Sequence, residues 1–249
     1  MKAWRHCAAA LFGVLPAEAI DRLLVEGDSR IVQLPDDSAH WRGSAQAMWE
    51  SRYLSEGRDN LAGESLASIC IEGGLGELNA SLWLAQSLDS GYREEQLGVA
   101  HNWEWGAIEW EVSANLICLP HGERDQEVGL RLLYPAGEHF EVHWHIDQSM
   151  QARGCYHLVE VVSPGWEAGG LAVDMKLGSG FNGGYVADGH RGLDHLSAAV
   201  EVRFALNATW RIFGNLLFAS AVGRNPRDHA GDSTLHDGWH FGAGVIAGF

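Results

Sequence analysis

The chain has 249 residues, of which 46% are hydrophobic, with 31 glycines, 11 tryptophans and only 6 prolines. This composition is too apolar for a disordered protein and too poor in proline for a collagen-like or linker sequence. The 17 basic and 33 acidic residues give a formal net charge of -16, which argues against nucleic-acid binding because affinity for phosphate backbones comes largely from basic side chains.

The N-terminus has the order of a secretory signal peptide. Two basic residues precede an apolar stretch from Cys7 to Leu15, and Ala17-Glu18-Ala19 follows with the small-x-small form of a cleavage site. The sequence therefore predicts a signal peptide over residues 1–19, the alternative being a short amphipathic helix. Residues 20–45 show no clean period, and we expect them to form an N-terminal periplasmic leader.

The remaining cysteines do not suggest a disulfide framework. After removal of the signal peptide, Cys70, Cys118 and Cys155 would remain, an odd number at wide spacing that fits neither a disulfide scaffold nor a zinc site. We interpret them as isolated thiols. No later run reaches the roughly 18 apolar residues of a transmembrane helix, which argues against a helical membrane protein.

From about Gln46 onward, apolar and polar residues alternate in segments of strand length. The alternation is unbroken over nine residues from Ile108 to Leu116, and a period of two is typical of strands with two unlike faces. The sequence predicts twelve strands, of which the eighth alternates least cleanly and is a candidate for a bulge. Their expected ranges are 46–55, 65–73, 78–88, 94–105, 108–119, 126–134, 139–148, 155–163, 171–180, 194–206, 210–222 and 238–249.

The connections between these strands also alternate in length. Short turns such as Gly106-Ala107 are interleaved with longer polar connections, of which the longest are 56–64, 182–193 and 223–237. Short turns at one end and long loops at the other are typical of an outer-membrane barrel. The sequence thus predicts an all-β, transmembrane, antiparallel up-and-down barrel over residues 46–249.

The polar face of the expected strands is heavily charged. Its mid-strand charged residues, the expected lining of the lumen, are Glu50, Arg52, Glu109, Glu111, Arg131, Glu141, Asp147, Asp174, Lys176, Glu201, Arg203 and Arg211. With Glu72, Glu104 and Glu127 added, the face holds ten acidic and five basic side chains. Carboxylates in a narrow passage attract cations, so we expect a cation-preferring lumen if the barrel conducts.

Aromatic residues of the apolar face gather near the strand ends. This pattern predicts two interfacial girdles. The first girdle would contain Trp103, Trp105, Trp110, Phe140 and Trp210 beside short turns, and the second Tyr53, Tyr156 and Trp239 beside long loops. The final alternating strand ends on Phe249, which we interpret as a signal to the barrel assembly machinery.

One segment carries a family resemblance. Residues Trp49 to Leu61, Trp-Glu-Ser-Arg-Tyr-Leu-Ser-Glu-Gly-Arg-Asp-Asn-Leu, are similar to the first-strand signature of porin-type outer-membrane barrels of Gram-negative bacteria, the TorF-type proteins and their relatives. In those families Ser-x-Tyr and a following glycine close strand one. The resemblance implies an outer-membrane barrel and brings no substrate with it.

Candidate sites of other kinds are weaker. His143, His145 and Asp147 share one strand face, but their spacing of 6 to 7 Å or so is too wide to close on one metal ion without ligands from a neighbouring strand. We therefore predict no metal site. Because no Gly-x-Ser-x-Gly motif and no strand-level Ser–His pair occurs, we also predict no catalytic residues, no enzyme activity and no cofactor.

These observations favour a small, passive, porin-like channel in the cell outer membrane. Its expected partners are outer-membrane lipids, the barrel assembly machinery and small solutes or ions. Two alternatives remain open, a plugged structural or adhesive barrel that acts through its external loops and a barrel enzyme that acts on lipids.

Overall fold

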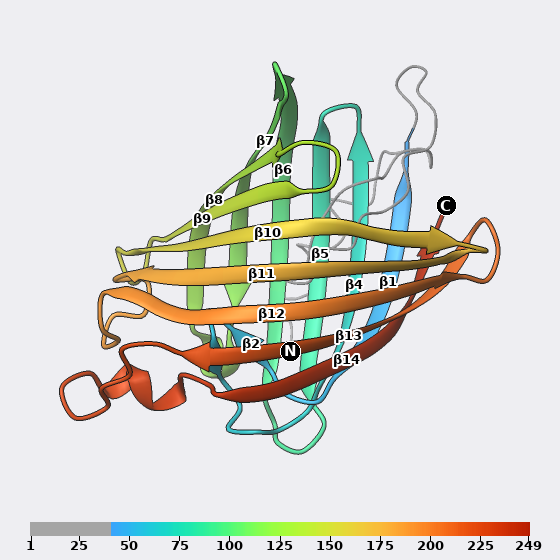
Figure 1. The fold of residues 1–249 in the computed structure, drawn as a ribbon. Helices are drawn as coiled ribbons and strands as arrows, with labels where there is room; N and C mark the ends of the chain where they lie inside the picture. Colours follow the sequence, from blue (N-terminus) through green and yellow to red (C-terminus); the bar gives the residue numbers. More distant parts are fainter. Residues whose placement is uncertain (1–40) are drawn as a thin grey trace.

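A computed structural model describes residues 41–249, and it consists almost entirely of β-strands (Figure 1). The barrel strands are β1 (Gly43–Glu50), β4 (Leu66–Leu75), β5 (Leu78–Ser87), β6 (Arg93–Trp105), β7 (Ile108–Cys118), β8 (Arg124–Pro135), β9 (Glu141–Ser149), β10 (Cys155–Ala168), β11 (Leu171–Gly183), β12 (Gly192–Ala205), β13 (Trp210–Ala221) and β14 (Gly238–Gly248). Two short 3-10 turns, η1 (Pro120–Gly122) and η2 (Ala230–Thr234), lie in connections. Between residues 41 and 249, none of the helical segments has the length and apolar character needed to cross a membrane.

The twelve strands form one closed antiparallel barrel. Each strand from β4 to β14 pairs with the next, and β1 closes the ring between β14 and β4, with Trp49 opposite both Ala243 and Ala67. A separate two-stranded sheet is formed by β2 (Leu54–Ser55) and β3 (Arg58–Asp59). The predicted fold class, an all-β barrel of twelve antiparallel strands, is confirmed. The predicted signal peptide lies outside the described residues, as does most of the predicted leader.

Two strands, β1 and β10, differ most from their expected ranges. β1 ends at Glu50, and the chain then forms the β2–β3 hairpin, so the Ser-x-Tyr segment lies outside the first strand. β10 extends to Ala168, and its register with β11 shifts between Ser163 and Trp166. At this bulge the Gly165 amide donates to Asp174 Oδ1 at 3.1 Å, so a charged side chain inside the barrel satisfies a backbone group that the ladder leaves out.

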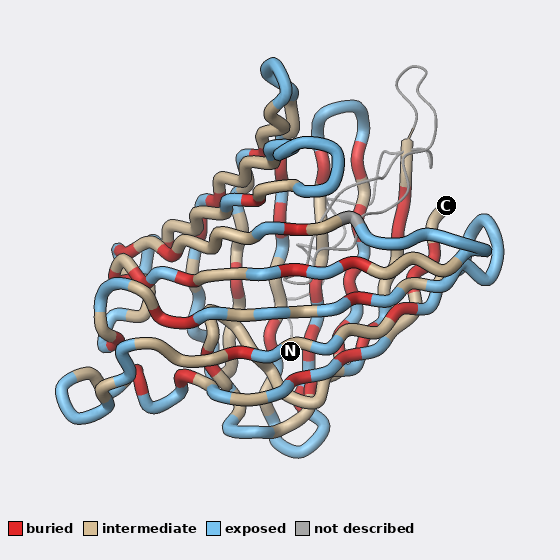
Figure 2. Tube along the Cα trace, in the orientation of Figure 1, coloured by how far each residue is buried: buried red, intermediate tan, exposed pale blue. Residues whose placement is uncertain are grey.

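The barrel is apolar outside and polar inside. Among the described residues, 33 large hydrophobic side chains are exposed, whereas the buried set contains 19 polar or charged residues and only 14 hydrophobic ones. Buried and exposed residues alternate along the strands, as Figure 2 shows. A soluble sandwich would bury its apolar face, so this arrangement identifies the apolar face as a lipid-facing surface.

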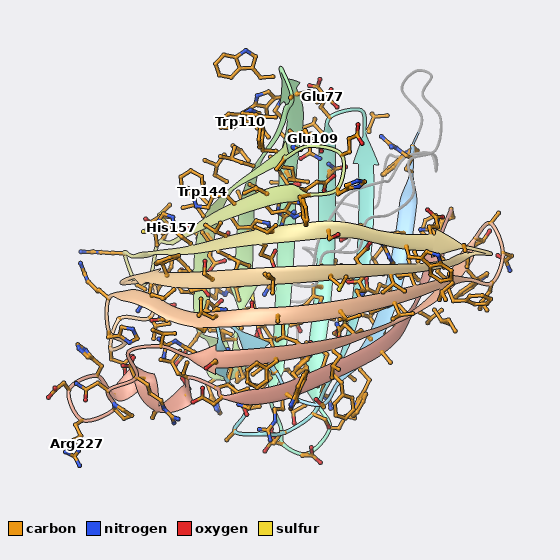
Figure 3. The ribbon with its side chains drawn as sticks, viewed as in Figure 1. Glu77, Glu109, Trp110, Trp144, His157 and Arg227 are labelled. Carbon is orange, nitrogen blue, oxygen red and sulfur yellow. The ribbon has the colours of Figure 1, made fainter. Side chains whose placement is uncertain are left out.

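The aromatic girdles differ in part from expectation. At the short-turn end, Trp105 is 74% exposed and Trp110 projects with it near the tip of the β6–β7 hairpin (Figure 3). At the loop end, two outward aromatic pairs, Trp49–Phe241 and Phe218–Trp239, take the place of the expected tyrosines. The expectation for Tyr53 and Tyr156 was wrong, because both rings lie inside the barrel.

The hydroxyl groups of Tyr53 and Tyr156 have polar partners inside the barrel. The hydroxyl of Tyr53 donates to Glu94 Oε2 at 2.9 Å, and the ring of Tyr156 stacks on His195 at 6.4 Å and is 3% exposed. A buried tyrosine hydroxyl needs a hydrogen-bond partner. Glu94 and His195 provide such partners inside the barrel, which explains the direction of both rings.

The last residue closes the barrel seam at the short-turn end. Gly43 N donates to the Phe249 carbonyl at 2.7 Å and Phe249 N donates to the Gly43 carbonyl at 2.8 Å, while the Phe249 side chain is 67% exposed. The Phe249 ring lies against the Gly43 backbone, where a Cβ would overlap it.

We expect Phe249→Ser to lower the amount of barrel inserted in outer membranes without lowering synthesis. The reason is that the ring is 67% exposed and available to the assembly machinery, while the backbone bonds of the seam require no particular side chain. The measurement is heat-modifiable gel mobility of outer-membrane fractions beside total protein. Phe241→Ser, which removes another outward phenylalanine of β14, is the matched control. Equal insertion of wild type and Phe249→Ser would contradict the prediction.

Candidate functional site

The inward faces of the strands enclose a cavity of about 1050 Å³. Its wall carries eleven carboxylic side chains and only two basic ones, Arg131 and Lys176. The carboxylic residues are Glu50, Glu56, Glu72, Glu94, Glu111, Glu123, Asp125, Glu127, Asp147, Glu160 and Glu201. The cavity is therefore a strongly acidic compartment, which concentrates cations and repels anions.

Six of the twelve charged residues singled out from the sequence line this cavity. They are Glu50, Glu111, Arg131, Asp147, Lys176 and Glu201. One ion pair joins neighbouring strands, with Arg131 Nη1 at 3.3 Å from Glu111 Oε1. Attraction between opposite signs on adjacent strands thus fixes some of the charges against the wall.

Asp174 and Arg203 lie below the cavity, toward the short-turn end, in a buried network. Arg203 forms an ion pair with Asp174 and places its Nε at 3.4 Å from Glu201 Oε1, while Lys176 Nζ is 3.6 Å from Glu201 Oε2. The network contains two acidic and two basic side chains, so each buried charge has an opposite charge beside it.

The four remaining residues lie elsewhere. Glu109, Glu141 and Arg211 are half-buried near the short-turn ends of β7, β9 and β13, outside the cavity wall. Arg52 lies beyond the end of β1, where its Nη1 is 2.7 Å from Asp59 Oδ2 of the β2–β3 hairpin. The early end of β1 explains this position, because the chain turns inward directly after Glu50.

A small apolar cluster narrows the lumen below the cavity. Met48, Phe213 and Ile246, from β1, β13 and β14, are buried together. The Phe213 ring lies on the backbone at Gly244, where any Cβ would overlap it, so glycine is required at this point of close approach. None of these residues lines the cavity, and neither do Asp174 and Arg203. We call these five side chains, which lie between the cavity and the short-turn end, the floor.

The β2–β3 hairpin folds into the loop end of the barrel. Its turn residues Glu56 and Gly57 both have positive φ, 48° and 71°, as a two-residue hairpin with the favoured twist requires. A Cβ at position 57 would overlap the His195 imidazole. Glycine therefore lets the hairpin tip approach the barrel wall closely.

Arg58 anchors the hairpin to the start of β12 and to the connection between β13 and β14. Its Nη2 is 2.7 Å from Asp194 Oδ2 and 3.8 Å from Asp232 Oδ1, and its Nη1 donates to the Gly231 carbonyl. His190 completes the cluster, with Nδ1 at 2.8 Å from Asp232 Oδ2. Arg58 is 2% exposed and both aspartates are fully buried. The cluster ties three connections together across the barrel mouth.

This cluster could not be predicted from the sequence, for a physical reason. Arg58, Asp194, Asp232 and His190 lie in connections or at a strand end, where charged residues are ordinarily solvated and carry no periodic signal. Only their spatial convergence distinguishes them from surface charges. The one available signal was the unusual length of the connections that carry them.

Glu56 gives the mouth a pH-dependent contact. Burial raises the pKa of its carboxyl to about 7; Asp147 and Glu94 push the pKa in the same direction, and the bond from Ser55 and the charge of Arg58 lower it. Because the folded-state pKa lies above the ordinary 4.5, this group stabilises hairpin docking at low pH, and that contribution is lost as the pH rises through about 7.

We therefore expect the Leu54–Asp59 amides of the wild type to exchange with solvent faster, relative to a Glu56→Gln variant, at pH 8 than at pH 5. Comparing the two proteins at the same pH cancels the intrinsic pH dependence of exchange. Hydrogen–deuterium exchange with mass spectrometry provides the measurement. A ratio that stays constant from pH 5 to pH 8 would argue against the contribution of Glu56.

The candidate metal ligands in the structure differ by one residue from the set considered in the sequence. His143 and His145 of β9 come together with Glu160 of β10, and one ligand atom from each lies within 4.8 Å of the others. Asp147, which the sequence placed on the same face as the histidines, is not in this group. The neighbouring strand thus supplies the third ligand that single-strand spacing lacked.

A closed twelve-stranded barrel with an apolar exterior and a polar, charged lumen has the architecture of outer-membrane β-barrels. No family model matches the chain, and no curated protein matches it either. The TorF-type assignment therefore rests on the Trp49–Leu61 segment alone.

Solved structures of this class share the fold. The KdgM porin covers 83% of this chain and 99% of its own, with a TM-score of 0.58 at 9% identity. The NanC porin covers 82% and 98%, with a TM-score of 0.53 at 8% identity. The COG4313 outer membrane channel from Pseudomonas putida F1 covers 91% and 100%, with a TM-score of 0.50 at 10% identity. These three structures are channels and porins, and at these identities the likeness concerns the fold alone.

Proposed function

We propose that the protein is a passive outer-membrane channel for small solutes with a preference for cations. The observation that carries this proposal is the acidic cavity inside the closed barrel, with eleven carboxylic side chains against two basic ones. In a narrow, low-dielectric passage such an excess raises the local concentration of cations. The apolar exterior supports the outer membrane as the location, with its lipids and the barrel assembly machinery as partners.

The proposed class of solute follows from the negative charge of the lumen. One of the similar structures is described as a KdgM porin in complex with disordered oligogalacturonate, a polyanion. The lumen of this chain would repel such a polyanion. Small cations and neutral molecules are therefore the solutes that we propose here.

The test is the reversal potential of purified barrels in a planar bilayer under a salt gradient. We expect cation preference in the wild type and a cation-to-anion permeability ratio that falls about twofold or more in a Glu94→Gln, Glu127→Gln double variant. Glu77→Gln is the matched control, because Glu77 is 69% exposed beside the outward-facing His101. Anion preference of the wild type would contradict the proposal.

A plugged barrel that acts through its external loops is the second candidate. The docked hairpin at the mouth and the floor formed with Met48, Phe213 and Ile246 favour it. If this candidate holds, the wild type should not conduct, whereas Phe213→Ala, which removes the largest side chain of the floor, should open a measurable conductance.

The proposed domain organisation keeps residues 1–19 as a signal peptide and ends the predicted leader at residue 42, because the barrel begins with β1 at Gly43 and not at residue 46. N-terminal sequencing of the membrane-inserted protein tests this arrangement. Cleavage after Ala19 is the expected result.

A further inference from the structure

Two histidines and a glutamate meet on the inner wall where β9 and β10 pair. His143 and Glu160 are direct partners across the antiparallel ladder, and His145 lies two residues further along β9 on the same face. The imidazoles of His143 and His145 stack with centroids 6.4 Å apart and planes inclined by 14°. One ligand atom from each of the three residues lies within 4.8 Å of the other two.

Glu141 orients His143. Oε2 of Glu141 is 3.1 Å from Nε2 of His143, and the His143 residue is fully buried. An ionised carboxylate can only accept a hydrogen bond, so Nε2 carries the proton and the lone pair of the neutral imidazole is on Nδ1. A carboxylate that holds one ring nitrogen while the other faces an ion is the usual outer-shell arrangement of metal-binding histidines.

We propose that His143, His145 and Glu160 bind one divalent first-row transition-metal ion in the lumen. Imidazole nitrogens with one carboxylate oxygen suit Zn²⁺, Ni²⁺, Cu²⁺ or Fe²⁺, whereas Ca²⁺ and Mg²⁺ prefer oxygen ligands alone. In a tetrahedral zinc site with bonds of about 2.0–2.2 Å, two ligand atoms lie about 3.3–3.6 Å apart. The three ligand atoms, which lie within 4.8 Å of one another, must therefore approach by up to about 1.5 Å to close on one ion.

The charges around the site suit a dication. Glu160 and Glu141 supply two negative charges, which balance the charge of the ion. Arg131 is the partner of His145 across the β8–β9 ladder, but its Nη1 is 3.3 Å from Glu111 Oε1. The arginine charge is therefore partly compensated by its own partner.

His145 and Glu160 line the acidic cavity, whereas His143 lies behind them. An ion that enters the cavity would thus meet the site on the wall. A consequence that rests on the proposed channel function is that transition-metal cations are among its solutes. Binding of the ion does not itself require conduction.

The test is Zn²⁺ titration of the full barrel, purified from outer membranes without a histidine tag, in competition with a chromogenic chelator. We expect one tight site per barrel, with affinity reduced at least tenfold by His145→Gln or Glu160→Gln and about 10- to 100-fold by Glu141→Gln. His240→Gln is the matched control, because His240 also lines the cavity beside a carboxylate, with Nε2 at 3.5 Å from Glu50 Oε1, but lies on β14. It should leave the affinity unchanged.

Cobalt provides a second measurement, which responds to metal binding and not to the folding of the barrel alone. The visible absorption of bound Co²⁺ should appear in the wild type and in His240→Gln and be lost in His145→Gln, with heat-modifiable gel mobility confirming that each variant is folded. Absence of a stoichiometric site, or equal loss in His240→Gln, would overturn the inference. Conductance is measured separately, so a barrel that binds Zn²⁺ without conducting contradicts the channel and leaves the metal site standing.

Discussion

Replacing Arg58 by methionine should destabilise the docking of the β2–β3 hairpin by about 3 to 5 kcal/mol, because it removes the guanidinium that pairs with the buried Asp194 and Asp232. Methionine keeps much of the side-chain volume, so the change is mainly electrostatic. The His236 amide, which donates to the Gly57 carbonyl at 2.9 Å, reports on docking of the hairpin. We expect its hydrogen exchange to accelerate about a hundredfold or more.

The matched control is Arg52→Met in the same connection. Arg52 is 38% exposed in its pair with Asp59, and a pair of this kind contributes about 0 to 1 kcal/mol. Equal effects of the two substitutions would show that the Arg58 cluster does not hold the hairpin. If the hairpin restricts the mouth, Arg58→Met should also increase conductance.

The second large effect is expected from a charge placed on the outer face. Val112 is 40% exposed in the middle of β7, opposite His101 of β6 and Leu130 of β8. Val112→Arg should destabilise the folded barrel in bilayers by about 2 to 4 kcal/mol, because the guanidinium would lie near the hydrocarbon midplane.

The adjacent residue provides the matched control, since Ser113 lines the acidic cavity. Ser113→Arg places the same charge among carboxylates, and we expect it to change stability by about 1 kcal/mol or less. Urea unfolding of barrels reconstituted in lipid vesicles measures both variants. Equal destabilisation would contradict the assignment of the two faces.

Side-chain periodicity determined the barrel. Alternation from Ile108 to Leu116 specified a strand with two unlike faces, and repetition of this pattern specified twelve strands of nearly the observed length. Alternation alone could not decide which face was exposed, because it is the same in a soluble sandwich, and the prediction of an apolar exterior came from the loop lengths, the aromatic residues and the charged face. The closed ring decided it, since closure leaves the charged face inside and the apolar face outside.

The C-terminal end of β1 is a feature that side-chain periodicity did not predict. The sequence extended this strand to residue 55, but it ends at Glu50 and the chain turns into the barrel. The Glu56-Gly57 turn and the buried ion pair of Arg58 provide the reason, because both stabilise an inward hairpin in place of a longer strand. Such a long-range contact leaves no trace in the local pattern.

Some of the functional groups could be predicted from the sequence, and others only from the tertiary structure. The excess of acidic residues on the polar face could be read from the sequence, because each inward position follows from a period of two. The grouping of His143 and His145 with Glu160, and of Arg58 with Asp194 and Asp232, required the tertiary structure. Strand register and loop docking bring these residues together from different parts of the chain, and neither is encoded in the spacing of any one segment.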